Sequence, residues 1–225
     1  MDSRLPLLTV DTVLFPGLVA PVPVADVQNR AVIRDLQASG DEEMICGALA
    51  IRDGYELGDR VFRSLHGVGC AAVVSDITGE AGDDGEGPLE VTLTGSRRFR
   101  VVELDGDGDY LVAKVDWLGE NAGSDPLGAA SIALERFRRY ADAVTEISRP
   151  GLHLGSLPDD PNTLSYLIAA AMVLIQPDRQ RLLEIIDTTS RLAHLVGLID
   201  SELAAMAALP SLPAIDISWS DLAPN

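Results

Sequence analysis

The sequence has little lysine and few aromatic residues. Of its 17 basic residues only Lys114 is a lysine, and the rest are arginines. A mechanism that requires a catalytic lysine therefore has one candidate, and that candidate lies in a strand-like stretch with no nucleophile motif nearby. Aromatic residues make up 4% of the chain and hydrophobic residues 47%, so we expect a mostly aliphatic globular core.

A basic face is also missing. The chain carries 35 acidic against 17 basic residues, a formal net charge of −18. The densest basic cluster is Arg97, Arg98 and Arg100, and one such cluster does not offset an acidic field of this size. Proteins that bind nucleic acid through phosphates carry a basic patch or stripe. The composition therefore predicts no nucleic-acid partner.

No segment is long and apolar enough to be a membrane anchor. The longest nearly apolar run, Leu164 to Ile175, has 12 residues, whereas a bilayer span takes about 20. The start, Met1-Asp2-Ser3-Arg4, lacks the features of a signal peptide. We therefore expect a soluble cytoplasmic protein without a membrane partner, with Cys46 and Cys70 as reduced thiols.

Motifs for metals, nucleotides and hydrolysis are incomplete. Gly67 to Ala72 matches G-x-G-x-x-A but reads as a turn before a strand, not as a strand–helix junction. Asp105, Asp107, Asp109 and Asp116 have the spacing of a calcium loop but lack its central glycine, because Tyr110 stands there. His66, Cys46 and Cys70 lack the paired C-x-x-C spacing of a zinc site, and neither His153 nor His194 has a G-x-S-x-G element to serve. We therefore expect no cofactor, no metal and no catalytic residue.

The first 120 residues predict a β-rich unit. Apolar stretches at 5–10, 18–24, 44–51, 68–77, 89–93, 99–104 and 110–117 are separated by proline, glycine and aspartate. Val27 to Gln37 is predicted as a short helix with Asp26 as its N-cap. Strands this close together indicate a small barrel or sandwich without βαβ units.

A helical unit is predicted after Asp125-Pro126, where a cap residue precedes a first-turn proline. Apolar residues from Leu127 to Val144 then recur every three or four positions. A second helix begins at Asp160-Pro161 and carries inward residues as far as Ile175, where Pro177 ends it. A short helix at 178–186 and a longer one from Thr188 or Thr189 to Met206 follow. The predicted division is 1–122 for the β-rich unit, 123–208 for the helical bundle and 209–225 for an extended tail with several apolar residues.

Several short stretches together resemble one known family. Leu5-Pro-Leu leads to Val13-Leu-Phe-Pro-Gly17, and Val68-Gly69 with Ala72 to Ile77 forms the next match. Gly95 to Glu103 and Gln180 to Glu184 follow in order. Taken together, the chain resembles the N-terminal, substrate-recognition domain of Lon-type ATP-dependent proteases. The resemblance implies an α+β fold, with a PUA-like pseudo-barrel followed by a helical bundle.

The resemblance also implies a function. The expected role is a non-catalytic protein-binding module that holds unfolded or partner polypeptides, as an adaptor, a weak chaperone or a partner of a separate protease. The chain has no G-x-x-x-x-G-K-[ST] phosphate loop and no Ser-Lys peptidase pair, so it is expected to be a stand-alone form without the ATPase and peptidase domains. The sequence leaves the oligomeric state open.

The expected binding surface lies at the first turn of the β-rich unit. Leu14, Phe15, Pro16 and Leu18 are the candidates, because an apolar turn is often either covered or used. The plainer interpretation is that these residues fill the barrel. Two other functions stay open: an RNA-binding module, because PUA-like barrels can bind RNA, and a small-molecule enzyme.

Overall fold

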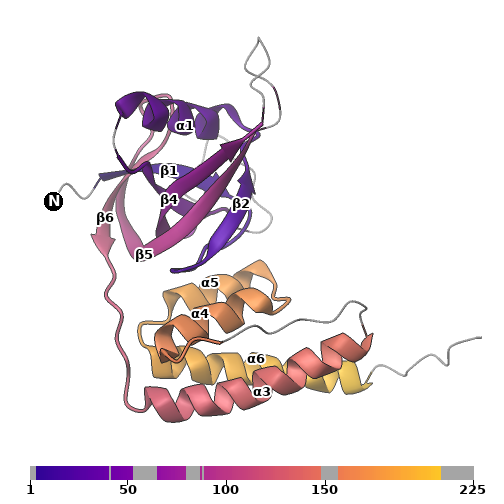
Figure 1. The fold of residues 1–225 in the computed structure, drawn as a ribbon. Helices are drawn as coiled ribbons and strands as arrows, with labels where there is room; N and C mark the ends of the chain where they lie inside the picture. Colours follow the sequence, from indigo (N-terminus) through magenta and orange to yellow (C-terminus); the bar gives the residue numbers. More distant parts are fainter. Residues whose placement is uncertain are drawn as a thin grey trace, which may run out of the picture.

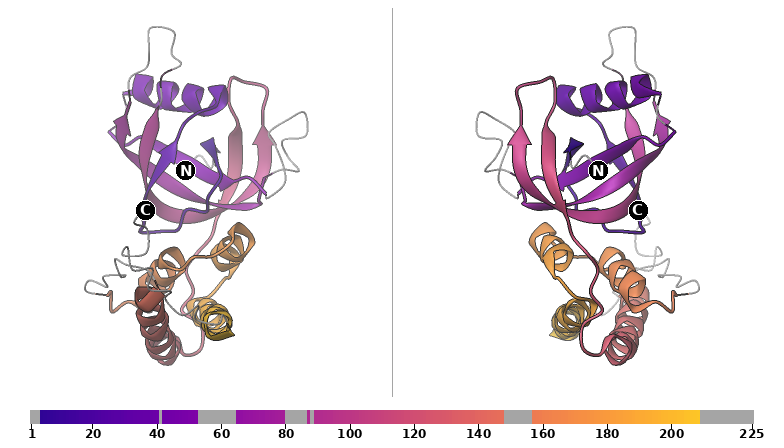
Figure 2. Two further views of the ribbon diagram at one scale, coloured as in Figure 1. Left: turned by 90° about the vertical axis from the view of Figure 1, so that its right-hand side faces the viewer. Right: turned by 90° about the vertical axis from the view of Figure 1, so that its left-hand side faces the viewer.

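The protein folds into a β-barrel resting on a layer of helices (Figure 1). The computed structural model describes residues 4–40, 42–52, 65–79, 87, 89–147 and 157–208. The predicted tail at 209–225 lies outside these residues. Two further views place helix α1 at one end of the barrel and the helical layer at the other (Figure 2).

Among the described residues, six strands form one sheet that closes on itself. The strands are β1 (Arg4–Val10), β2 (Val19–Pro23), β3 (Ile45–Ala50), β4 (Val68–Thr78), β5 (Glu90–Asp105) and β6 (Val112–Trp117). Their order is β2-β5-β4-β3-β1-β6, and β6 pairs with β5 as well as with β1. This second pairing closes the ring, and the predicted α+β class with a pseudo-barrel and a helical part is confirmed.

Two details of the predicted barrel are wrong. The separate strands predicted at 89–93 and 99–104 are one continuous strand, β5, whose first half pairs with β2 and whose second half pairs with β6. The glycine and polar residues between them looked like a break, but Gly95 and Arg97 still pair with β4, with a β-bulge at Ser96. The expected absence of parallel crossovers also fails, because β1 and β3 pair in parallel and the chain between them contains α1.

Helix α1 (Val27–Ser39) covers one end of the barrel. The predicted cap is confirmed, because the Asp26 side chain accepts a hydrogen bond from the Asn29 amide N–H. The Asn29 side chain is buried and bonds both main-chain groups of Thr9: its Oδ1 accepts from the Thr9 N–H at 2.9 Å and its Nδ2 donates to the Thr9 carbonyl at 2.8 Å. The Asn29 side-chain amide thus makes with Thr9 the two main-chain hydrogen bonds that a neighbouring strand would otherwise make.

The helical layer contains α3 (Pro126–Ile147), α4 (Pro161–Ala171), α5 (Gln176–Glu184) and α6 (Thr188–Ala208). The predicted start of α4 is confirmed, with Asp160 as its cap. Its predicted length is wrong, because α4 ends at Ala171 and Ile175 is 66% exposed. Pro177 does not end a helix but occupies the first turn of α5, where its missing N–H costs nothing. Leu127, predicted to face inward, is 71% exposed.

The buried apolar residues form three clusters. Two lie wholly within the barrel and α1. The third belongs mainly to the helices but also contains four residues of the β-rich unit: Val13, Phe15, Ala50 and Val68. The β-rich unit therefore packs against the bundle. Strand β6 ends at Trp117 and α3 begins at Pro126, and the predicted domain limits at 122/123 and 208/209 stay a proposal.

Candidate functional site

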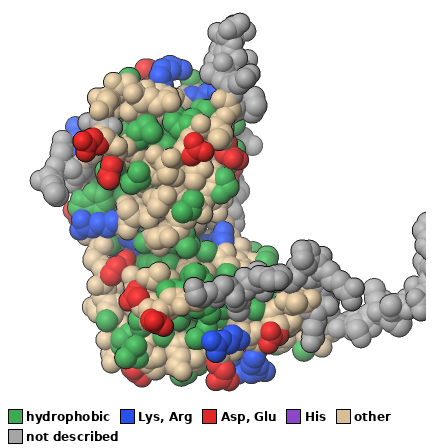
Figure 3. Space-filling model, viewed as in Figure 1, with side chains coloured by type: hydrophobic (Ala, Val, Ile, Leu, Met, Phe, Trp, Pro, Cys, Tyr) green, Lys and Arg blue, Asp and Glu red, His purple; other side chains and the backbone are tan. Residues whose placement is uncertain are grey.

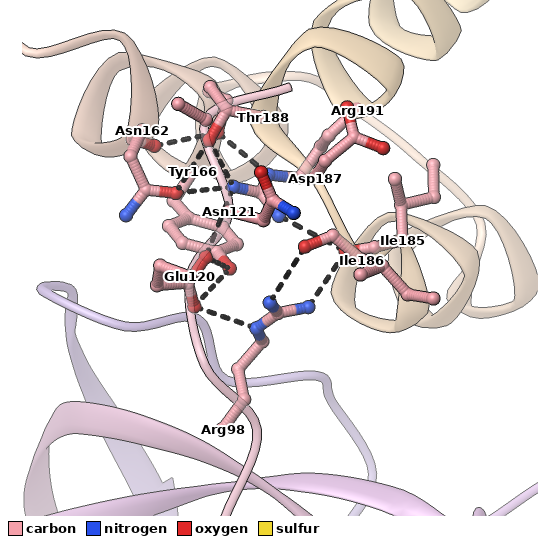
Figure 4. Close-up of polar contacts among 12 residues, drawn as sticks. Arg98, Glu120, Asn121, Asn162, Tyr166, Ile185, Ile186, Asp187, Thr188 and Arg191 are labelled. Carbon is pink, nitrogen blue, oxygen red and sulfur yellow. Dashed lines mark hydrogen bonds and ion pairs between the residues drawn. The ribbon is translucent and has the colours of Figure 1, made fainter. Parts of the chain in front are cut away.

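A buried arginine from the barrel fixes the helical layer in place. Arg98 on β5 is 1% exposed, and its Nη1 donates to the carbonyls of Leu183 and Ile185 at 2.8 and 2.7 Å. These carbonyls lie at the C-terminal end of α5, where a helix leaves its acceptors unpaired and favours a positive charge. Arg98 Nε also donates to Glu120 at 2.7 Å (Figure 4). The barrel thus supplies the cap of a helix in the other layer.

A second buried arginine completes this network. Arg191 on α6 is fully buried, donates from Nε to Ser165 Oγ at 2.8 Å, and lies over the Tyr166 ring at 4.0 Å. Its Nη2 reaches the other oxygen of Glu120 at 3.5 Å and also bonds Asn162. Burial lowers the pKa of Arg191, and the same cause raises the pKa of Tyr166. Because these groups bond one another, we interpret the network as structural.

The four residues predicted from the sequence do not share one environment. Leu14 is 5% exposed and belongs to the barrel core, and Phe15 is 1% exposed and stacks on Tyr166 at a centroid distance of 5.8 Å. Pro16 and Leu18 are half-buried. A polypeptide can thus reach only Pro16 and Leu18, while Leu14 and Phe15 hold the turn in position.

Gly95 explains how this turn is attached to β5. The Gly17 N–H donates to the Gly95 carbonyl, and the Gly95 N–H donates to the Leu18 carbonyl, both at 2.8 Å. A Cβ at position 95 would lie 2.2 Å from the Phe15 carbonyl oxygen. Gly17 has a φ of +76°, which favours glycine. Gly17 and Gly95 thus allow the backbone of the turn and the backbone of β5 to come into close contact.

A slot opens beside this turn, between the facing edges of β1 and β2. Its volume is about 300 Å³. We call it the edge slot; its lining is Thr9, Val10, Asp11, Thr12, Pro21, Val22, Pro23, Ala25, Asp26, Asn29 and Ile51. Sequence reasoning missed it, because its walls come from segments up to 42 positions apart, and the parallel β1–β3 pair that brings Ile51 to Val10 is not evident from the sequence.

The main chain along the edge slot has few free hydrogen-bonding groups. Thr9 is already paired with Asn29, and the Asp11 carbonyl accepts from Gln176 at 3.0 Å. At the two ends of β2, the Val24 N–H donates to the Leu89 carbonyl and the Leu18 carbonyl accepts from the Gly95 N–H. The alternation of an antiparallel ladder then turns the main chain of 19, 21 and 23 outward. Two of these three positions are proline, which has no N–H to donate.

An exposed apolar turn lies next to the edge slot. Between α4 and α5, Val173 is 81% and Ile175 is 66% exposed. Gln176, which follows Ile175, bonds the Asp11 carbonyl, and Arg179 bonds Thr12 Oγ1 at 3.3 Å. Because Asp11 and Thr12 line the slot, the turn and the slot share a border. We call the slot together with Val173 and Ile175 the junction surface.

The motifs considered for metals and nucleotides have ordinary structural roles. Cys46 and Cys70 are buried, and burial raises the pKa of each thiol to about 12. Gly69 lies within β4, where a Cβ would meet the Ala48 carbonyl oxygen at 2.5 Å. Asp105 pairs with Arg4 at 2.6 Å. Among the residues that the structure describes, no three His, Cys, Asp or Glu side chains are grouped to hold a metal ion, and no described helix combines the length and hydropathy for crossing a membrane.

The arginine cluster of the sequence, Arg97, Arg98 and Arg100, is divided between the interior and the surface. Arg98 is buried in the network, and Arg97 lies over the Trp117 ring at 4.7 Å. On the face shown in Figure 3, basic side chains are scattered among acidic ones, and hydrophobic side chains appear over both the barrel and the helices.

The fold and the junction surface define a barrel-and-helix module with a polar network between its layers and an apolar surface at their border. Residues 4–201 match the family model of the ATP-dependent protease La (LON) substrate-binding domain. The chain belongs to this family. The Lon resemblance that the sequence motifs indicated is therefore confirmed.

Similar proteins include long proteases and isolated domains. The chain is 28% identical over 200 residues to Lon protease 2 of Myxococcus xanthus and 29% identical over 204 residues to the Lon protease of Xanthomonas oryzae pv. oryzae. These matches cover 87% and 88% of this chain but 23% of each protease. The chain therefore spans about a quarter of the length of these relatives.

Two solved structures share the fold. The N-terminal domain of a Mycobacterium avium complex Lon protease aligns with a TM-score of 0.60 and 24% identity, covering 88% of this chain and 98% of that one. A Lon N-terminal domain protein from Xanthomonas campestris aligns with a TM-score of 0.58 and 21% identity, covering 86% and 97%.

Proposed function

We propose that the protein is a non-catalytic module that binds exposed segments of other polypeptides, as an adaptor or weak chaperone for clients or for a separate protease or chaperone. The observation that carries this proposal is the exposed apolar turn, Val173 and Ile175, placed beside an apolar slot. Membership of a substrate-binding domain family supports the same function.

The chemistry of the junction surface suits unfolded segments. Burying an exposed aliphatic side chain contributes about 1.5–3 kcal/mol, and two such side chains stand together on a turn held by Gln176 and Arg179. A folded client hides its aliphatic residues, whereas an unfolded one presents them. The turn is therefore expected to select for unfolded state rather than for a particular sequence.

The residues predicted from the sequence enter the proposal in two ways. Pro16 and Leu18 are half-buried and are proposed as weaker contacts at the edge of the binding area. Leu14 and Phe15 are proposed to act through positioning, because their side chains are buried.

Fluorescence anisotropy with a labelled unfolded protein tests the proposal. Reduced, carboxymethylated α-lactalbumin should bind, and native α-lactalbumin should bind at least tenfold more weakly. The double variant Val173→Ser/Ile175→Ser should lose about tenfold in affinity for the unfolded form, and Leu18→Ser less. The matched control is Val102→Ser/Ile132→Ser, which removes two side chains that are each 54% exposed elsewhere. Equal loss in both double variants, or no binding, contradicts the proposal.

The non-catalytic part has its own test. The purified 225-residue chain is expected to hydrolyse neither ATP nor casein, because its sequence has no phosphate loop and no Ser-Lys peptidase pair. Activity that persists through extensive purification, at constant specific activity, overturns this expectation.

A further inference from the structure

The edge slot combines an apolar floor with acidic groups. Val10, Val22 and Ile51 line it together with Pro21 and Pro23. Asp11 and Asp26 are its two charged lining residues, and both are acidic. Such a slot suits a ligand that is apolar along its length and cationic at its end.

The two carboxylates keep acceptor capacity for a ligand. Asp26 accepts one hydrogen bond through Oδ1 from the Asn29 N–H at 2.8 Å. Asp11 is exposed and forms no ion pair with any residue that the structure describes. The nearby cations are used elsewhere: Arg179 donates to Thr12 and to the Ala170 carbonyl, and Arg52 donates to the Leu65 carbonyl.

The main chain of the slot offers little to the main chain of a ligand. The outward positions Pro21 and Pro23 lack donors, and Asn29 already occupies Thr9. Strand addition, in which main-chain hydrogen bonds supply the affinity, is therefore disfavoured at this edge. Because Pro21 and Pro23 leave only carbonyl acceptors there, we expect a ligand to be recognised mainly through its side chains.

We infer that the edge slot binds a lysine or arginine side chain of a client polypeptide, an inference that rests on the proposed function. The aliphatic stem lies along Pro21, Pro23 and Ile51, and the cationic end reaches Asp11 and Asp26. Long basic side chains commonly place their stems on apolar surface and keep the charge at a polar rim. The net charge of −18 adds a long-range attraction for a cationic side chain. The preferred clients are thus apolar segments that contain a basic residue.

Four labelled peptides of one apolar sequence test this inference by anisotropy. They carry at a central position lysine, norleucine, glutamate, or lysine with neighbouring N-methylated amides. The lysine peptide should bind about three- to tenfold tighter than the norleucine peptide, as expected for exposed ion pairs, and the glutamate peptide should bind weakest. N-methylation should change the affinity by less than about twofold, because the slot accepts no strand.

Charge-removing variants locate the effect. Asp11→Asn and Asp26→Asn should each reduce the preference for lysine over norleucine, and the double variant should abolish it while norleucine binding stays constant. Asparagine is also a good N-cap, so Asp26→Asn keeps α1 capped. Asp142→Asn is the matched control, because it removes one exposed carboxylate from α3 and should leave the preference intact.

The outcomes separate the inference from the proposed function. Equal binding of the lysine, norleucine and glutamate peptides overturns the inference and leaves polypeptide binding standing. Loss of binding on N-methylation shows strand addition and also overturns it. If neither the peptides nor carboxymethylated α-lactalbumin binds, the proposed function fails and the inference fails with it.

Discussion

The barrel and the helical layer differ in how they obtain a core. Two of the three apolar clusters consist of barrel and α1 residues alone, whereas the cluster of the helices includes Val13, Phe15, Ala50 and Val68. The end of α5 is capped by Arg98 from β5. The helical layer thus depends on the barrel both for part of its apolar packing and for hydrogen-bond donors to the end of α5, whereas the barrel core is built from its own residues.

The largest expected effect comes from the centre of the shared cluster. Phe137 is fully buried there, and Phe137→Ala should cost about 3–5 kcal/mol of unfolding free energy through lost burial and a cavity. Because the cluster joins both layers, barrel and helices should unfold in one transition. Trp117 fluorescence in a Trp219→Phe background reports on the barrel, and far-ultraviolet circular dichroism reports on the helices. Two separated transitions, with only the helical signal shifted, contradict the dependence of the helical layer on the barrel.

A smaller loss is expected at the polar link between the layers. Arg98→Met removes the cap of α5 and one partner of Glu120, and should cost about 2–3 kcal/mol. This is less than for a fully buried ion pair, because the Glu120 side chain is 33% exposed and keeps Tyr166 and Arg191 as partners. Chemical denaturation measures the loss. Arg97→Met is the control, since Arg97 is exposed and lies on Trp117. An equal loss of unfolding free energy in Arg97→Met contradicts the role of Arg98 in linking the two layers.

The attachment of the β1–β2 turn provides a third test. In Gly95→Ala the added methyl group meets the Phe15 carbonyl oxygen at 2.2 Å, and this oxygen belongs to backbone that cannot move freely. Overpacking of this kind costs about 1–3 kcal/mol. Gly67→Ala, where a Cβ meets nothing within 4 Å, should change the midpoint of urea unfolding little. A stable Gly95→Ala protein is inconsistent with the close contact.

The smallest effect concerns the thiols in the barrel core. Burial raises the pKa of Cys46 and of Cys70 from 9.0 to about 12. The folded state thus favours the neutral thiols, so their contribution is complete below pH 9 and is lost as the pH rises toward 12. Between pH 9 and 10 the loss should be roughly 1 kcal/mol per thiol. Urea titrations at both pH values measure it, and Cys46→Ala should make the decline shallower; an unchanged slope refutes this origin.

Local features of the fold could be predicted from the sequence. Asp26 and Asp160 cap their helices as predicted, because capping depends on a few neighbouring residues. The continuity of β5 could not be predicted, because Gly95 resembles a strand break in the sequence, whereas in the structure it contacts a turn some 80 positions earlier in the chain. Likewise, nothing in the sequence indicated that Arg98 and Arg191 are buried and linked to one another through Glu120.

The candidate surface shows the same limit. The predicted turn, Leu14 to Leu18, lies at the border of the layers, but burial removes half of its residues from contact with a partner. Ile175 was predicted to be inside a helix, and it stands in the exposed turn because α4 ends four residues earlier. The edge slot combines residues of β1, β2 and α1 with Ile51, and periodicity alone carries no information on the strand order that brings them together.

The Arg98 cap also bears on the order of events during synthesis. The carbonyls at the end of α5 find their donor on a strand 85 and 87 positions earlier, so this contact closes a long loop and forms late. On the ribosome the barrel strands emerge first and can pair before α5 exists. We therefore expect a nascent chain that ends before α5 to expose the barrel surface around Val13, Ala50 and Val68, and to be the species most prone to aggregation.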